Sequence, residues 1–373
     1  MLYICPPQAD PSGADSFIEL MQSIKKIKIK NRKIILRAGL NVPLDFETGK
    51  ILDDSRLRAS KKSIDFILEQ KPKMLLVISH LGRPEGKNIP ELSFEKIVES
   101  WEKILGRRVI LIHKIERLQA IMQAGVFDSE AVYLLENLRF WQSEKNNDAE
   151  FAEKIAHGFG VYVNDAFSVS HRNHSSIVQL PKFTQDKAMG LLFEEEYKNL
   201  SVVRDKPKKP AIAIIGGAKI VTKLPVIKNL AKKYEAVLVG GMVANEALDE
   251  KIKFPKNVIL PIDFSPEEKA GERLDIGPLT IVFFREEIQK AKTIVWNGPL
   301  GKFEDEEASN GTRNITKFIE QNKEAFSLIG GGETLEAIKK FGDFKKYNYV
   351  SKSGGAMLEF LAGNKLPGVE ALS

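Results

Sequence analysis

The chain has 373 residues, 43% of them hydrophobic and 28% charged, which is ordinary globular usage and argues against a disordered or membrane-spanning protein. This length exceeds what one hydrophobic core usually serves, so we expect two domains. Lys and Arg outnumber Asp and Glu by 56 to 50, a net charge of +6 that favours anionic ligands.

The cysteine content and the first residues indicate a reducing compartment. Cys5 is the only cysteine, so the chain can form no internal disulfide and has no second thiolate for a zinc site. The opening MLYICPPQAD lacks the basic start and long apolar stretch of a signal peptide. We therefore expect a cytoplasmic protein with no membrane partner.

The basic excess makes nucleic acid a rival ligand. The lysine-rich stretches lie at 25–33 and 206–210, and neither contains an interleaved aromatic residue. These stretches are more typical of solvated surface, so we expect no nucleic-acid partner.

Strand-like runs alternate with amphipathic stretches along the whole chain, which is the pattern of βαβ units. The predicted strands lie near 33–38, 73–78, 109–112, 131–135, 159–163, 211–215, 236–239, 257–261, 293–296, 326–329 and 347–350. The pattern predicts an α/β fold with a mostly parallel sheet in each half.

A helix is predicted between the two halves. Its apolar residues recur at steps of four, four and three, as one helix face requires: Met189, Phe193, Tyr197 and Leu200. The stretch 206–210, KPKKP, ends it. This helix is either a lever for the relative motion of the domains or a connector packed on the surface.

In the first half, several strands run into a basic turn. The cations lie mostly just past predicted strand ends: Arg56, Arg83, Arg139 and Arg172, with His80, His171 and His174. Parallel strands bring such turns to one edge, and arginines pair bidentately with carboxylate or phosphate oxygens, so we predict a polyanion site. The alternatives are a separate structural ion pair for each arginine and a packed or surface imidazole for each histidine. His80 is favoured for function because Gly82 and Pro84 fix its turn.

In the second half, four strands run into glycine-rich or polar turns, at 216–219, 240–242, 297–299 and 330–334. They match neither the P-loop nor the dinucleotide fingerprint, but glycine lets backbone amides at a helix start approach phosphates. Lys219 and Lys223 share one helical face and can neutralise phosphates, and Glu333 offers a carboxylate to magnesium. Close strand-to-helix packing also needs glycine, but four such turns in one domain are harder to explain by packing.

Specific motifs follow one another in order and spacing from Lys33 to the C-terminus. They are NVP at 41–43, DDSRLR at 53–58, SHLGRP at 79–84, ENLRF at 136–140, YVNDAF at 162–167, HRNH at 171–174, GGAK at 216–219, DIGP at 275–278, TIVWNGPLGKFE at 293–304, GGGET at 330–334 and SGGAMLEFLAGNKLPGVEAL at 353–372. Together they resemble the phosphoglycerate kinase family.

The resemblance implies a monomeric enzyme with two Rossmann-like domains, which transfers a phosphoryl group reversibly between 1,3-bisphosphoglycerate and Mg-ADP to give 3-phosphoglycerate and ATP. It implies a triose domain at 1–186 with 360–373 packing back on it, an interdomain helix at 187–205 and a nucleotide domain at 206–359.

The family's site residues carry over position by position. The implied triose site comprises Asn41, Arg56, His80, Arg83, Arg139 and Arg172. The implied nucleotide site comprises Gly217, Lys219, Lys223, Gly240, Asn297, Pro299, Glu304, Gly332, Glu333 and Thr334. Counterparts of Arg56 and Lys219 contact the phosphoryl group in transit, the counterpart of Glu304 holds the ribose, and Glu333 would face Mg²⁺.

The chain departs from the family pattern at a few positions. Gly39 stands where the motif R-x-D-x-N-V-P has an aspartate on the triose site. The other departures are Thr222 and Glu333, each in place of an aspartate, Lys352-Ser353 in place of Thr-Gly, and Lys302 at an apolar position of the adenine pocket.

Three functions remain open from the sequence. The first is a working phosphoglycerate kinase with altered kinetics, which the intact arginine set favours. The second is a divergent member that has lost the reaction and serves as a nucleotide-binding or interaction protein. The third is nucleic-acid binding through the basic excess.

Overall fold

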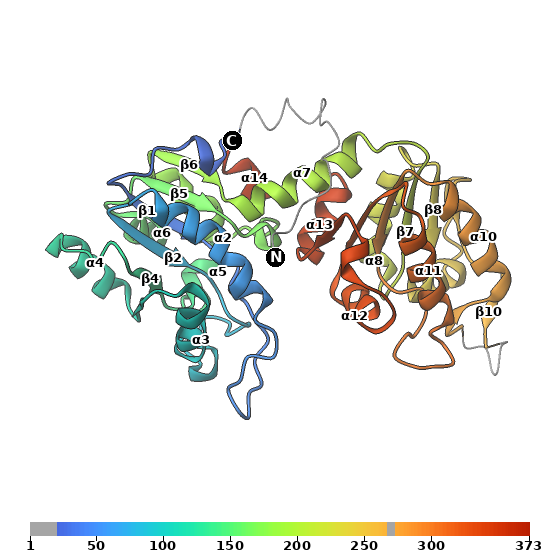
Figure 1. Cartoon of the computed structure of the whole chain (residues 1–373), viewed down its shortest axis with the longest axis horizontal. Helices are drawn as coiled ribbons and strands as arrows, with labels where there is room; N and C mark the ends of the chain where they lie inside the picture. The colour runs from blue at the N-terminus through green and yellow to red at the C-terminus, as the bar shows by residue number, and fades with distance from the viewer. Residues whose placement is uncertain (1–20, 267–272) are drawn as a thin grey trace. The chain divides into compact units, whose positions relative to one another are not determined.

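The computed structural model describes residues 21–266 and 273–373, so Cys5 and the other opening residues lie outside the described part. The chain divides into two compact units. Of the described residues, the first unit contains 21–197 and Lys365–Ser373, and the second contains those from Lys198 to Asn364. The first is coloured blue to green in Figure 1 and the second yellow to red, apart from the red C-terminal helix α14 (Pro367–Glu370), which belongs to the first.

The first unit is built on a six-stranded parallel sheet with the order β3-β4-β2-β1-β5-β6. Its strands are β1 (Lys33–Arg37), β2 (Met74–Ile78), β3 (Val109–Ile112), β4 (Val132–Leu135), β5 (Val161–Asn164) and β6 (Asp186–Met189). Every residue of β2, β4 and β5 is buried, because helices cover both faces of a parallel sheet.

Helices α2 and α3 pack on one face of this sheet, where Leu57, Ile64 and Trp101 meet the strand residues of the core. Helices α4 and α6 contact each other, and α6 and α14 contact the segment 175–179. The helices of this unit are α2 (Ser55–Glu69), α3 (Glu95–Leu105), α4 (Ile115–Ala124), α5 (Gln142–Lys145), α6 (Ala149–Ala156) and α14 (Pro367–Glu370), with short turns of helix at Ile24–Lys26, Pro90–Leu92, Leu138–Phe140, Phe167–Val169, Ser175–Gln179 and Leu180–Phe183.

The second unit repeats the architecture with the strand order β14-β13-β12-β7-β8-β9, again all parallel. Its strands are β7 (Ala211–Ile215), β8 (Ala236–Val239), β9 (Val258–Ile259), β12 (Thr293–Asn297), β13 (Phe326–Gly330) and β14 (Tyr349–Ser351). A separate antiparallel pair joins β10 (Phe264–Ser265) to β11 (Asp275–Ile276).

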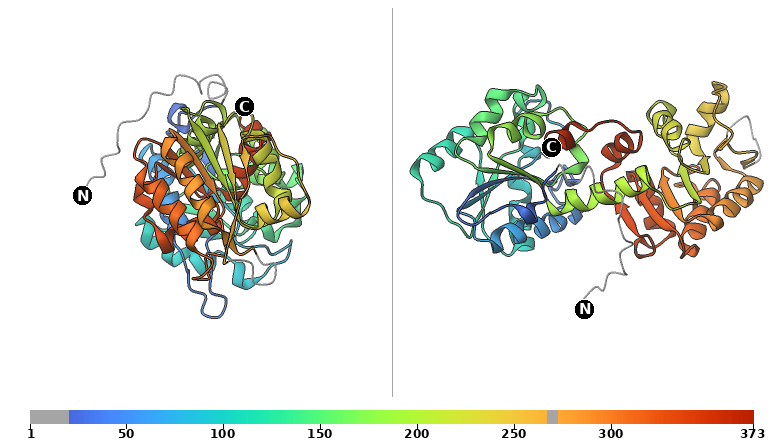
Figure 2. Two further views of the ribbon diagram at one scale, coloured as in Figure 1. Left: turned by 90° about the vertical axis from the view of Figure 1, so that its right-hand side faces the viewer. Right: turned by 90° about the horizontal axis from the view of Figure 1, so that it is seen from above.

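Helices cover both faces of the second sheet. On one face α10, α11 and α12 bury Phe284, Ile315 and Ile338 against the strands, and on the other α8 contacts α9 and α13 (Figures 1 and 2). The bounds are α8 (Ile220–Leu230), α9 (Gly241–Asp249), α10 (Pro278–Lys290), α11 (Asn310–Gln321), α12 (Gly332–Phe341) and α13 (Gly354–Leu361), with a short turn of helix at Phe344–Lys346. The predicted α/β class is thus confirmed.

The predicted connecting helix exists as α7 (Leu191–Asp205), but it begins later than expected. Met189 belongs to strand β6, where it pairs with Asn164, so a helix from 187 is wrong. The strand was missed because Asp186 and Lys187 make it half polar, as an edge strand allows. Asp165 lies just after β5, and its Oδ1 accepts the backbone N–H groups of α7 residues 192 and 193 at 2.8 and 3.2 Å.

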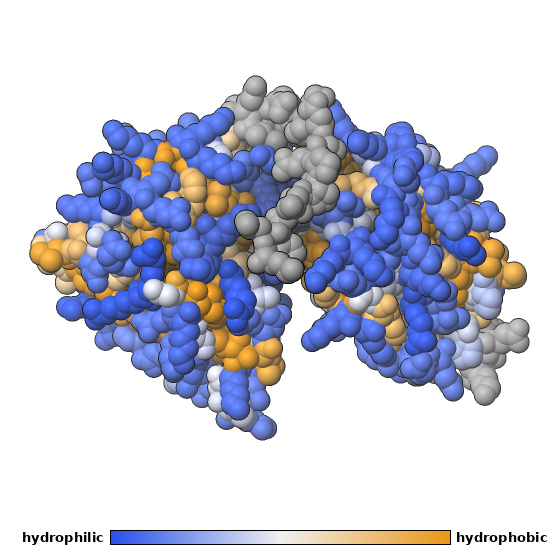
Figure 3. Space-filling model, in the orientation of Figure 1, coloured by the Kyte–Doolittle hydropathy of each residue, from blue (hydrophilic) through white to orange (hydrophobic). Residues whose placement is uncertain are grey.

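The surface agrees with the interpretation of the lysine-rich stretches. Lys26, Lys28 and Lys30 are exposed between buried isoleucines, and Lys208 and Lys209 are exposed as well. Hydrophilic side chains cover most of the face drawn in Figure 3. None of the described helices is long and apolar enough to cross a membrane.

Candidate functional site

Loops at the carboxyl edge of the first sheet carry the predicted cations. Strands β4, β2, β1 and β5 are neighbours, so the turns that follow them share one edge. Asn41 follows β1, His80 follows β2 and Arg139 follows β4, while Arg56 lies in the first turn of α2. The fold therefore brings residues from distant parts of the sequence to one place.

Arg37, the last residue of β1, lies buried beneath this edge with 1% of its surface exposed. Its Nη1 donates to the carbonyl oxygen of Ala38 at 2.5 Å, and its Nε donates to Ser176 Oγ at 3.2 Å. Its Nη2 lies 3.0 Å from Nδ1 of His80. The guanidinium thus joins three segments of the chain beneath this edge: the end of β1, the turn after β2 and the segment around Ser176.

The buried His80 is held as a neutral ring. Because a guanidinium can only donate, Nδ1 of His80 accepts from Arg37 and the ring proton is on Nε2. Burial lowers the pKa of His80 well below its ordinary value, and the charges of Arg37, Arg139 and Arg56 lower it further. His80 therefore presents an N–H donor at neutral pH.

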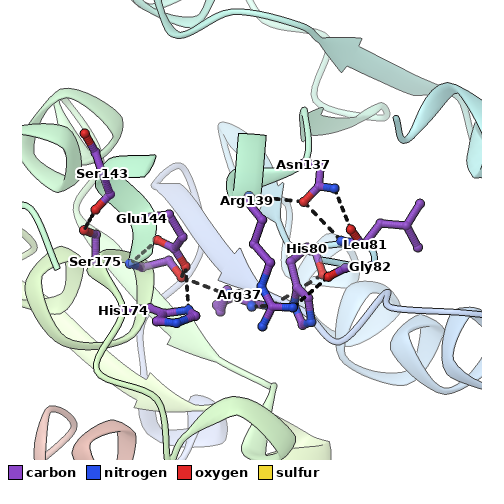
Figure 4. Close-up of polar contacts among 12 residues, drawn as sticks. Arg37, His80, Leu81, Gly82, Asn137, Arg139, Ser143, Glu144, His174 and Ser175 are labelled. Carbon is purple, nitrogen blue, oxygen red and sulfur yellow. Dashed lines mark hydrogen bonds and ion pairs between the residues drawn. The ribbon is translucent and has the colours of Figure 1, made fainter. Parts of the chain in front are cut away.

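The turn after β2 is held from both sides. Asn41 Oδ1 accepts from the backbone N–H of Gly82 at 2.8 Å, and Arg139 Nη1 donates to the carbonyl oxygen of Gly82 at 2.7 Å. The side chain of Asn137 accepts from the backbone of Leu81 at 3.1 Å and donates to it at 2.7 Å (Figure 4). These contacts set the positions of His80 and Arg139.

One buried carboxylate balances the cluster. Glu144 is 1% exposed, accepts Ser176 Oγ at 2.6 Å and the Ser176 backbone N–H at 2.9 Å, and lies 3.6 Å from Nδ1 of His174 (Figure 4). Burial acts to raise the pKa of Glu144, but His174, Arg37 and Ser176 together outweigh it and the pKa lies below its usual value. Glu144 is therefore ionised and neutralises part of the Arg37 charge.

The remaining cations exceed the carboxylates. Burial lowers the pKa of Arg139 to about 10, and the positive charges of Arg37 and Arg172 act in the same direction. Burial also lowers the pKa of Arg56. Arg83 and Arg172 are exposed. Mutual repulsion among like charges is relieved when a multivalent anion binds, so this edge has the electrostatics of a polyanion site.

In the second unit the predicted glycine turns pack on one another. The backbone N–H of Gly217 donates to the carbonyl oxygen of Pro299 at 2.7 Å, and that of Gly241 donates to Leu300 at 2.9 Å. A Cβ at Gly298, where φ is +94°, would lie 2.1 Å from the Gly216 carbonyl oxygen. Packing between backbones therefore explains the glycines of three of the four turns. For these three turns, the expectation that packing does not explain the glycines is wrong.

The fourth turn differs because a Cβ at Gly332 would meet no atom within 4 Å. Gly332 is the exposed first residue of α12, and Thr334, two residues on, is buried and accepts the Gly298 backbone N–H at 2.7 Å through its Oγ1. Helix N-terminal amides next to open space suit a phosphate. Packing within the chain gives no reason for glycine at this position.

Lysines flank these turns. Lys223 is buried in α8, and its Nζ donates to Asn297 Oδ1. Burial lowers the pKa of Lys223 to about 8, and Glu333 partly opposes this shift. Lys219 precedes α8 with a left-handed φ of 66° and is exposed. The two cations that were predicted for phosphates thus lie just before α8 and in its first turn, and Lys223 reaches Asn297.

The remaining predicted nucleotide residues occupy neighbouring loops. Gly240 follows β8, and its N–H donates to the Ile215 carbonyl at 3.0 Å. Glu304 is exposed, and Lys340 Nζ donates to its carbonyl oxygen at 3.2 Å. Lys302 is exposed and lies 3.9 Å from Asp305.

Among the described residues no group of three or more His, Cys, Asp or Glu side chains forms a metal cage. Glu333 is exposed in the first turn of α12, next to the open space at Gly332. Magnesium usually takes one or two carboxylates plus substrate phosphates, so a lone carboxylate beside a phosphate site fits Mg²⁺ arriving with a nucleotide.

Sequence reasoning missed Arg37 and Glu144 as site residues. An arginine that ends an otherwise apolar strand, KIILR, was a usable signal, because a buried charge needs partners. Glu144 gave no comparable signal, since its burial depends on α5 packing against the segment 175–179.

Comparison with known proteins agrees with the motifs. The family model described as phosphoglycerate kinase matches residues 24–253 and 246–364. Phosphoglycerate kinase of Koribacter versatilis is 37% identical over 94% of this chain and 98% of its own, and that of Acidobacterium capsulatum is 36% identical with the same coverage.

Solved structures agree as well. Phosphoglycerate kinase from Coxiella burnetii superposes with a TM-score of 0.84 at 30% identity, and that from Pyrococcus horikoshii with 0.79 at 30%. Each comparison covers 94% of this chain and 98% of the other.

Proposed function

The chain belongs to the phosphoglycerate kinase family, and we propose that it is a working phosphoglycerate kinase, transferring a phosphoryl group reversibly between 1,3-bisphosphoglycerate and Mg-ADP. The products of the forward reaction are 3-phosphoglycerate and ATP. The observation that carries the proposal is the surplus of cations around Arg139, whose depressed pKa reflects burial and neighbouring arginines. A site of this kind suits a ligand that bears both a carboxylate and a phosphate.

The residues of the first unit hold the triose. Arg139 and Arg56 offer forked donors to anionic oxygens, His80 offers its Nε2–H, and the exposed Arg83 and Arg172 complete the set. Arg37 acts through His80 and the floor of the site, as a positioning residue.

The residues of the second unit hold the nucleotide. The open N-terminus of α12 and the lysines at 219 and 223 would face phosphates, and Glu333 would hold Mg²⁺. Mg²⁺ supplies charge neutralisation on the phosphate oxygens when bound. Gly217, Gly240, Asn297, Pro299, Glu304 and Thr334 complete the proposed site.

The chemistry needs no general base. In the ATP-consuming direction the acceptor is a carboxylate that is already ionised at pH 7. Its oxygen forms a bond to the γ-phosphorus, the bond from that phosphorus to the ADP oxygen breaks, and the electron pair leaves with ADP. Catalysis then consists of positioning and of stabilising charge, which arginines and lysines supply.

Because the proposal puts acceptor and donor on different units, the two ligands must be brought together and water kept out for transfer to occur. Arg56 and Lys219 are proposed to meet on the phosphoryl group in transit. We further propose that the chain works as a cytoplasmic monomer.

A coupled assay tests the proposal. With 3-phosphoglycerate, ATP and Mg²⁺, formation of 1,3-bisphosphoglycerate is followed through its reduction by a glyceraldehyde-phosphate dehydrogenase and NADH. We expect turnover that requires all three components. Nucleotide binding without turnover would instead support the impaired, nucleotide-binding alternative, which the comparisons do not favour.

A further inference from the structure

The side chains predicted for the triose site present hydrogen-bond donors, and their acceptor atoms are already used within the chain. Arginines can only donate. Among the other predicted residues, Asn41 uses its Oδ1 on the Gly82 backbone N–H at 2.8 Å, so the group it has left for a ligand is its Nδ2 donor. His80 uses Nδ1 on Arg37 at 3.0 Å, so its free nitrogen carries a proton.

The nearby carboxylates and amides also take part in hydrogen bonds or ion pairs within the chain. Ser176 binds both oxygens of Glu144 through its Oγ and backbone N–H. Asn137 accepts from the Leu81 and Arg139 backbones, and its Nδ2 donates to two carbonyl oxygens. At the rim, Asp53 accepts the Ser55 backbone N–H at 2.8 Å, and Glu85 is bonded to Lys145.

The turn between Arg37 and Asn41 is where an acceptor has room. Gly39 lies in this turn, and a Cβ built on it would meet no atom within 4 Å. Its φ is not among the left-handed values, so any side chain is allowed there. The chain thus has room but no polar side chain at position 39, two residues from Arg37 and two from Asn41.

We infer that this site binds three-carbon phosphorylated carboxylic acids with little regard to whether the middle carbon carries a hydroxyl or a carbonyl group. The inference rests on the proposed function and names its substrate class. An ionised carboxylate, a phosphate and a carbonyl only accept hydrogen bonds, and a hydroxyl is the one group of such ligands that also donates. A site with no acceptor makes no hydrogen bond to the hydroxyl proton of the ligand. Binding pockets reject an analogue strongly only when the lost hydrogen bond leaves a polar group of the pocket unpaired.

The expected reaction is the same for both ligands. A carboxylate oxygen of the 2-oxo acid forms a bond to the γ-phosphorus of ATP, and the bond to ADP breaks with its electron pair. The product is the acyl phosphate of the 2-oxo acid, and no oxidant or reductant takes part.

The test compares 3-phosphoglycerate with its 2-oxo analogue, 3-phosphohydroxypyruvate, by isothermal titration calorimetry and by ADP release. The wild type is expected to bind the two with dissociation constants within roughly threefold of each other. Gly39→Asp, which adds an acceptor, is expected to favour the hydroxyl compound by roughly tenfold or more, because its carboxylate accepts from a hydroxyl and repels a carbonyl oxygen. Gly39→Ala fills the space without an acceptor and is expected to keep the wild-type ratio.

The ratio is the readout, because a carboxylate at position 39 also weakens the binding of every anion. His174 is checked as well, since its Nδ1 lies 3.6 Å from Glu144 and its Nε2 has no partner of that kind among the described residues. His174→Phe should leave the wild-type ratio unchanged.

A tenfold preference of the wild type for either ligand, or an unchanged ratio in Gly39→Asp, would overturn the inference. Equal binding without ADP release from either ligand would refute the proposed function and leave the inference standing. Failure of both ligands to bind at millimolar concentration would refute both.

Discussion

Replacing Arg37 by methionine should destabilise the first unit strongly. The change removes hydrogen bonds to Ala38, Ser176 and His80, and it takes away the positive charge of Arg37 from the buried Glu144, which keeps only Ser176 and His174 as partners among the described residues. Removing one partner of a buried charge pair typically costs about 3–5 kcal/mol, against a total stability of about 5–15 kcal/mol. We expect a loss in that range at pH 7.5.

The size of the loss should depend on pH. In the wild type the pKa of Glu144 is held below its usual value, so its stabilisation is present above the unfolded pKa and is lost as the pH falls through the folded pKa. Without Arg37 the folded pKa rises, because burial then meets less opposing charge. The penalty of Arg37→Met should therefore shrink as the pH falls toward 5.

Urea unfolding followed by near-UV circular dichroism measures the effect, with hydrogen exchange of the β1 and β2 amides reporting on the first unit. The double variant Arg37→Met/Glu144→Gln should recover about 2 kcal/mol relative to the sum of the single variants. Arg58→Met is the matched control, since Arg58 pairs with Asp54 on the surface and should cost under about 1 kcal/mol. A loss below 1 kcal/mol for Arg37→Met, or strict additivity in the double variant, would refute the reasoning.

Three further predictions concern catalysis, stability and specificity. Arg56→Ala and Lys219→Ala should each lower kcat and kcat/KM together by roughly 100-fold, since contacts made mainly in the transition state affect both; near-normal kcat at saturating substrate would make that residue a binding group. Burial raises the pKa of Asp165 to about 6, so the stability this group contributes is full below the unfolded pKa of about 4 and is lost as the pH rises to about 6. Asp165→Asn keeps the acceptor for α7. As the pH rises from about 4 to about 6, the free energy of unfolding measured in urea should fall by about 2–3 kcal/mol more in the wild type than in this variant. Parallel curves of unfolding free energy against pH would contradict this prediction. Lys302→Val should increase the preference for ATP over GTP in steady-state assays, because the lysine stem can cover a base while its ammonium stays in water; an unchanged ratio of kcat/KM values would argue against a role in base choice.

The strands of this protein could be predicted closely from the sequence. Most strands of the two sheets are largely apolar runs, as parallel strands buried on two faces must be, and β2, β7 and β8 were placed within a residue of their bounds. The failures were β6, which is half polar at a sheet edge, and the two-residue strands β10 and β11, which are too short to show a pattern.

The gathering of Asn41, His80 and Arg139 at one edge of the first sheet could also be predicted, because a position just after a strand end follows from the order of the elements. What only the tertiary structure decided is how those groups are satisfied. Glu144 accepts from Ser176, whose hydroxyl oxygen in turn accepts from Arg37, so three separate segments meet there, and Gly216 meets Gly298 through backbone contacts between the loops that follow two strands. The burial of Arg37 and Glu144, the tautomer of His80 and the shifted pKa values of these groups depend on neighbours that are distant in the sequence. They are therefore determined only by the assembled tertiary structure.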